Sequence, residues 1–177
     1  SGGAIDVGNA TAGASLTDAD IRRQGRTLVL VYTVSGPDGD RSHLAQMTGR
    51  GWRHVGAFDA SRLPLARSLA VDEEHVFLLV GDGLAVLDKE GITVRELADI
   101  DPAEITDLEA GRGQWLGRPI FVRNTDPDGV LQSVSLAVGH MDGDAVTIES
   151  SLPLHAPDRW NFAGDTPLAI SPDGRYA

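Results

Sequence analysis

The chain has 177 residues, of which 41% are hydrophobic and 23% charged, and its formal net charge is -11 at pH 7. This composition predicts one folded domain with a hydrophobic core and argues against intrinsic disorder. The acidic balance argues against a nucleic-acid partner, and the absence of cysteine excludes disulfides, thiolate nucleophiles and Cys-ligated metal centres.

The N-terminal segment is built from small residues. Residues 1–15 are rich in Gly and Ala and carry one charge, Asp6, so we expect a linker or disordered arm. This segment has neither the basic residues nor the apolar core of a signal peptide. The longest apolar runs, residues 28–34 and 76–80, are far shorter than the ~20 residues of a membrane-spanning helix, so we expect no direct membrane insertion by this chain.

Residues 16–25 fit two local structures. Thr17 and Gly25 could cap and end a short helix, or the segment could form a polar strand, which the repeat described below favours. The next segments are less ambiguous, because β-branched and aromatic residues alternate with Gly-rich turns. They predict strands at 26–35, 41–48 and 52–58, turns at 36–40 and 49–51, and a connection at 59–64.

Residues 68–100 form the clearest unit in the sequence. Polar or Gly-rich turns separate four short runs of strand-forming residues, at 68–71, 75–80, 84–87 and 92–97. The recurring glycines disfavour a helix. We therefore predict a four-stranded antiparallel meander, which cannot bury both of its faces alone and needs neighbours on either side.

The remaining segments continue the β pattern. Asp101, Pro102 and Glu104 occupy the cap, first and third positions of a short helix. Strands are expected at 105–115, 119–123, 130–138 and 145–150, with a turn at 141–144 and a polar connection at 152–165. Residues 166–177 resemble the start of another unit.

An internal repeat relates these segments. Leu-Ala-Val at 69–71 recurs as Leu-Ala-Ile at 168–170, each before a turn and an extended run, and the two starts lie 99 positions apart. Two units of about 50 residues fit this spacing. We therefore predict an all-β fold of β-propeller-like four-stranded blades, about 16–60, 66–100 and 104–152 with the next starting at 166; an irregular β-sandwich is the alternative.

The final residues carry a family resemblance. The sequence LAISPDGRYA at 168–177 resembles the inner-strand turn of WD40-like and TolB-like β-propeller repeats, in which SPDG joins the first two strands of a blade. The copy at 69–74 has Asp-Glu-Glu in place of that turn, and the Trp-Asp dipeptide of WD40 blades is absent. The resemblance therefore implies the propeller fold and transfers no functional residue.

Three blades and a fragment do not close a ring, since propellers have at least four blades. Open sheets tend to pair with other chains. We therefore expect this chain to associate with the remainder of a propeller, from the same gene or from a second chain.

One loop resembles part of a calcium site. Asn124, Asp126 and Asp128 place oxygen atoms at the first, third and fifth positions of a calcium loop, with Gly129 at the sixth. The ninth and twelfth positions are Gln and Ser, so the acidic ligand that closes such a shell is missing. A plain hairpin loop is the favoured interpretation, with calcium binding as the alternative.

The other candidate residues are isolated in the sequence. The histidines show no paired metal-ligand spacing, so each is expected to be structural or solvated: His43, His54, His75, His140 and His155. The tryptophans are expected to pack between blades, with Trp52 and Trp160 as candidates for contact with a ligand or partner. No nucleophile elbow or phosphate-binding glycine motif occurs.

These observations favour a non-enzymatic binding or interaction scaffold that presents loops to a protein or small ligand. Every basic residue except Lys89 is Arg, which indicates a GC-rich bacterial gene. Fold analogy then suggests a periplasmic or secreted setting, such as a soluble insert or sensor domain of a membrane transport protein. The enzymatic alternative is half of a propeller hydrolase or quinone-type dehydrogenase with its site at the central channel.

Overall fold

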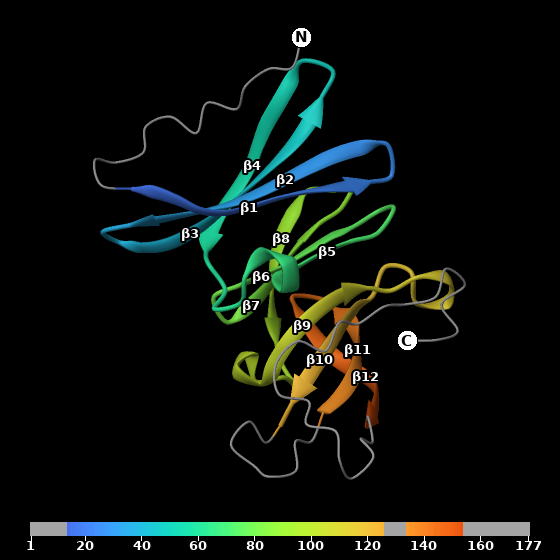
Figure 1. The fold of residues 1–177 in the computed structure, drawn as a ribbon. Coiled ribbons are helices and arrows are strands. Elements are labelled where there is room, and N and C mark those ends of the chain that lie inside the picture. The colour runs from blue at the N-terminus through green and yellow to red at the C-terminus, as the bar shows by residue number, and fades with distance from the viewer. Residues whose placement is uncertain (1–13, 126–133, 154–177) are drawn as a thin grey trace, which may run out of the picture.

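The structure is a computed structural model that describes residues 14–125 and 134–153. In these residues the protein is all-β, as the sequence predicts. Twelve strands form three four-stranded antiparallel units that follow one another along the chain (Figure 1). The first unit spans residues 15–59, the second 69–97 and the third 105–153.

The first unit is a meander of long strands. Its bounds are β1 Ser15–Gln24, β2 Thr27–Gly36, β3 Gly39–Thr48 and β4 Gly51–Asp59. The strand alternative for residues 16–25 is therefore confirmed. Gly25 has a φ of +54°, and a Cβ there would lie 3.0 Å from the carbonyl oxygen of Glu73. The β1–β2 turn and its approach to the second unit thus both favour glycine.

The second unit confirms the meander predicted for residues 68–100. Its bounds are α1 Leu65–Ser68, β5 Leu69–Val71, β6 Val76–Val80, β7 Gly83–Leu87 and β8 Ile92–Leu97. The helical turn α1 was not predicted, and Ser68 ends it instead of starting β5. In the β7–β8 turn the Asp88 carboxylate accepts hydrogen bonds from the backbone N–H groups of Glu90 and Gly91, at 2.7 and 3.1 Å.

The third unit differs from the sequence prediction where β9, β11 and β12 end, at residues 110, 142 and 153 instead of 115, 138 and 150. Its bounds are η1 Pro102–Glu104, β9 Ile105–Ala110, η2 Gly113–Trp115, β10 Pro119–Asn124, β11 Val134–Asp142 and β12 Ala145–Pro153. The strand expected at 105–115 ends at Ala110, because the chain turns back so tightly that a Cβ on Gly111 would overlap the backbone of Trp115. The turn expected at 141–144 is shorter, since β11 continues to Asp142. The predicted helix cap is confirmed: Asp101 accepts a hydrogen bond from the Ala103 N–H at 2.8 Å.

The second and third units join into one sheet. β8 and β12 pair in parallel at two positions, Glu96 with Ala145 and Leu97 with Val146, which gives the strand order β5-β6-β7-β8-β12-β11-β10-β9. The outer edges β5 and β9 also contact one another. The eight strands therefore form a nearly closed, barrel-like sheet, a connection between neighbouring units that the sequence did not predict.

The three units stack, and the second lies in the middle (Figure 1). Alternate residues of β6 enter different cores: Phe77 and Leu79 pack towards the third unit, whereas Val76, Leu78 and Val80 pack towards the first. All five are buried. The expectation that this meander needs neighbours on either side is therefore confirmed.

Candidate functional site

The outer face of the first unit, which points away from the second, is mostly apolar. Residues paired across an antiparallel sheet share a face, so the register defines its rows. One row is Ile21, Leu30, Ala45 and His54, and the next is Ala19, Tyr32, His43 and Ala57. Trp52, expected to pack between blades and a candidate for contact with a ligand or partner, lies on this face opposite Met47 and is half-buried.

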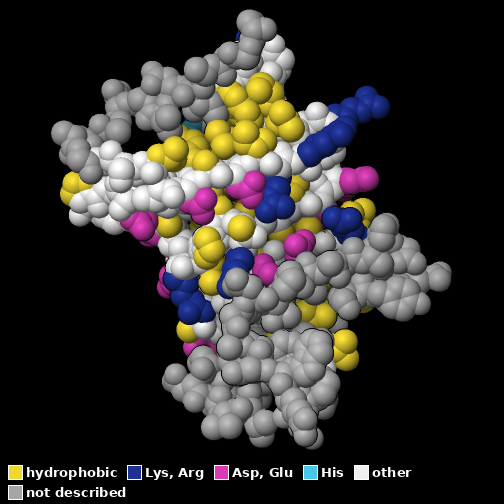
Figure 2. Space-filling model, viewed as in Figure 1, with side chains coloured by type: hydrophobic (Ala, Val, Ile, Leu, Met, Phe, Trp, Pro, Cys, Tyr) yellow, Lys and Arg dark blue, Asp and Glu magenta, His cyan; other side chains and the backbone are white. Residues whose placement is uncertain are grey.

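This outer face is partly exposed. Ile21 is 58% exposed and Leu28 41% exposed, whereas Val29 and Val31 on the opposite face of β2 are fully buried against the second unit. Figure 2 shows hydrophobic side chains gathered over the first unit, in the upper part of the view. β2 is thus apolar on both faces, a pattern typical of strands that are covered on both sides. No other unit covers this outer face among the described residues, although Tyr32 and Ala45 within it are buried.

A cleft of about 710 Å³ lies beside this unit, where β4 meets the β6–β7 turn and β8. Phe58 and Val94 supply apolar surface, and the Arg41–Asp59 ion pair, 2.7 Å long, lies at its side. Arg95 also lines the cleft, and its Nε is buried without a hydrogen-bond partner in the described part of the chain. Because Asp82 and Glu96 add two further carboxylates, the mixed charges do not define one class of ligand.

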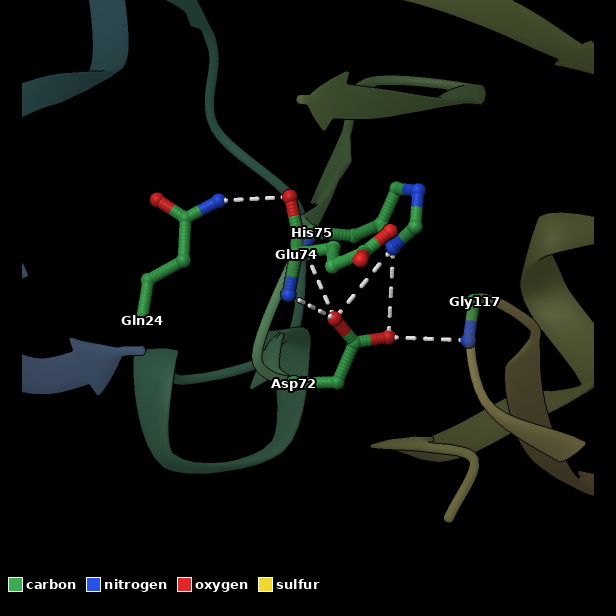
Figure 3. Close-up of polar contacts among 5 residues, drawn as sticks. All are labelled: Gln24, Asp72, Glu74, His75 and Gly117. Carbon is green, nitrogen blue, oxygen red and sulfur yellow. Dashed lines mark hydrogen bonds and ion pairs between the residues drawn. The ribbon is translucent and has the colours of Figure 1, made fainter. Parts of the chain in front are cut away.

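A buried carboxylate at the β5–β6 turn links the second and third units, and the backbone of the same turn accepts a hydrogen bond from the first unit (Figure 3). The Asp72 side chain is 2% exposed. It accepts hydrogen bonds from the backbone N–H groups of Glu74, His75 and Gly117, at 2.7, 2.6 and 3.0 Å. His75 Nδ1 lies 3.2 Å from the same carboxylate, and Gln24 of β1 donates to the Glu74 carbonyl at 2.8 Å. These contacts hold the β5–β6 turn against the segment that precedes β10.

The charges of this pair are stabilised by folding. Burial would raise the pKa of Asp72, but hydrogen bonds from His75 and from two backbone N–H groups outweigh it and lower the pKa below 3.8. The hydrogen bond to Asp72 raises the pKa of His75 above 6.5 despite burial, and Asp88 and Glu74 add to that shift. An ion pair therefore forms between Asp72 and His75 in mildly acidic solution.

This pair makes a prediction about pH. A raised histidine pKa stabilises the fold below pH 6.5 and loses its effect as pH rises through the folded value. A lowered carboxyl pKa stabilises above pH 3.8 and loses its effect as pH falls through the folded value. We therefore expect the wild type to have a higher free energy of unfolding than His75→Gln, and we expect this difference to be largest between pH 3.8 and pH 6.5. Urea unfolding from pH 3 to 9 measures it.

The exposed His140 on β11 supplies the control for this experiment. His140→Gln should follow the wild-type pH profile. A constant difference between the wild type and His75→Gln across that range would contradict the ion pair.

The loop that resembles part of a calcium site is only partly described. Asn124 ends β10 and is half-buried, while Asp126 and Asp128 lie outside the described residues, as does Trp160. The calcium interpretation and the role of Trp160 therefore stay predictions, and the repeat at 168–177 also lies outside this part. In the residues that the structure describes, no group of three or more His, Asp or Glu side chains is placed to hold a metal ion.

The structure brings two histidines together that the sequence left isolated. His43 and His54 lie on neighbouring strands of the outer face, with their rings in contact. The sequence could have indicated this contact through the hairpin turn at 49–51. If the two strands are paired outward from that turn, both histidines fall on one face of the sheet.

The fold and surface together define an all-β protein of stacked four-stranded antiparallel units with an apolar end face. No protein-family model, curated protein or solved structure matches the chain.

Proposed function

We propose that this chain is a non-enzymatic interaction scaffold, a part of a β-propeller-like stack whose outer face docks a further four-stranded β-unit. The observation that carries this proposal is the outer face of the first unit, where Ile21, Leu28 and Trp52 leave an apolar sheet surface partly exposed. Burial of such a surface is favourable by about 25 cal/mol per Å². The first and second units already pack face to face as two separate sheets, with Val29 and Leu44 against Leu78.

The order of the strands supports the propeller-like part of the proposal. The first strands of the three units lie in series, with β1 beside β5 and β5 beside β9, as the innermost strands of successive blades do. Each unit then continues strand by strand away from this edge. The pairing of β8 with β12 is not expected between the blades of a propeller. It favours the alternative fold, an irregular β-sandwich.

We further propose an extracytoplasmic setting, as a soluble insert or sensor domain of a bacterial membrane transport protein. Its support is the analogy of fold and the acidic, Arg-rich composition. Among the described residues, none of the helices is long and apolar enough to cross a membrane. Fractionation of cells that express the tagged full-length gene product tests the setting, and recovery in the cytoplasm alone would contradict it.

For the 177-residue chain in solution, the available docking unit is a second copy. We expect concentration-dependent dimerisation in sedimentation-velocity experiments. Ile21→Lys should weaken it at least tenfold, because a charge would be buried in the interface. Ile21 is 58% exposed, so the same change should leave the fold intact.

Val94→Lys is the matched control, since Val94 is 53% exposed on β8 and lies outside the proposed interface. Its dimerisation should equal that of the wild type. A wild-type chain that stays monomeric at all accessible concentrations, or an equal loss of association in both variants, would overturn docking at this face.

A further inference from the structure

The two histidines of the outer face are held as a pair. His43 lies on β3 and His54 on β4, and the register between these strands shifts between Leu44 and Ala45, which leaves Val55 as an extra residue on β4. The Nδ1 atom of His43 lies 3.4 Å from the Nε2 atom of His54, with 5.6 Å between ring centroids. This distance is at the long limit for a hydrogen bond between two nitrogens.

A third ring fixes the orientation of the pair. The Tyr32 ring stacks on His43 with 4.9 Å between centroids and an interplanar angle of 3°. The two histidine rings are tilted by 54°. His43 is half-buried and His54 is exposed, so the pair lies at the surface of the sheet with one side open to solvent.

The spacing of the nitrogens suits a shared metal ion. Two imidazoles bound to Zn²⁺ at about 2.0–2.1 Å in tetrahedral geometry have nitrogens about 3.3–3.4 Å apart. Neutral imidazole is the form that binds metal.

The nearest charge outside the pair is partly neutralised. The Arg41 guanidinium acts on His43, as His54 does, and would oppose a bound cation, but it forms an ion pair with Asp59 at 2.7 Å. The other side chains in the rows of this pair are apolar or Tyr32. The pair therefore offers two nitrogen ligands of the kind that zinc, copper and nickel prefer over calcium or magnesium.

We propose that His43 and His54 form a two-histidine site for a divalent transition-metal ion such as Zn²⁺ on the outer face of the first unit. His43 binds through Nδ1 and His54 through Nε2, and water fills the remaining coordination positions on the open side. This site is separate from the calcium loop suggested by the sequence. It lies within the outer face proposed for docking, and both of its ligands come from a single chain.

Calorimetric titration of the 177-residue chain with Zn²⁺ tests the site. We expect one site that weakens at least tenfold in His43→Phe and in His54→Ala. Phenylalanine keeps an aromatic ring against Tyr32 and removes only the ligand, and thermal unfolding without metal checks that each variant folds. His140→Ala, which removes an exposed histidine elsewhere, should bind like the wild type.

Sedimentation at the zinc concentration used shows whether binding occurs in the monomer or the dimer. No zinc binding by the wild type, or equal affinity in the wild type, His43→Phe and His54→Ala, would overturn the proposal. The pair would then be a weak hydrogen bond between two neighbouring rings.

Discussion

Replacing Asp72 with alanine is expected to lower the free energy of unfolding by about 3–5 kcal/mol. The carboxylate is 2% exposed and accepts hydrogen bonds from three backbone N–H groups, two in its own turn and one on Gly117 of the third unit. Alanine would leave these donors without a partner in the protein interior, and it would also remove the partner of His75. Urea unfolding at pH 6 measures the loss.

Asp88→Ala is a comparison for this experiment at a similar turn, although the Asp88 charge also acts on His75. Asp88 makes the same kind of turn between β7 and β8, where its carboxylate accepts hydrogen bonds from Glu90 and Gly91. That turn is exposed, so water can replace the lost acceptor, and we expect a loss of about 1 kcal/mol or less. Similar losses in the two variants would show that the contact of Asp72 with the third unit contributes little.

The strands follow from local sequence, which explains why they could be predicted. The meander at 69–97 combines short β-branched runs with turns that contain Gly81 or Asp88, and both turn residues have the roles that their chemistry indicates. Residues 16–25 needed the repeat argument, because their polar sequence also fits a short helix. The predicted strand at 105–115 was too long, because the sequence does not show that the chain turns back at Gly111. Glycine is needed there because the Trp115 backbone approaches closely.

The contacts between units could not be predicted in this way. Asp72 belongs to a polar turn in the sequence, and only the position of Gly117, 45 residues away, makes it a buried centre. The pairing of β8 with β12 likewise depends on how two meanders approach each other. The contact of His43 with His54 is shorter in range, and the hairpin register could have indicated it.

Phe77→Ala and Leu78→Ala are both expected to be strongly destabilising, by about 3–5 and 2–5 kcal/mol. The two residues are neighbours on β6, fully buried, and belong to different cores: Phe77 packs against the third unit and Leu78 against the first. If one side of this sheet faced solvent, the residue on that side could be replaced by alanine with little loss of stability. Val94→Ala on β8, where the side chain is 53% exposed, should cost about 0.5 kcal/mol or less. Chemical unfolding of the three variants measures these losses.

If Leu78→Ala cost no more than Val94→Ala, the first unit would not cover the second. The stacked arrangement from which docking is inferred would then be wrong.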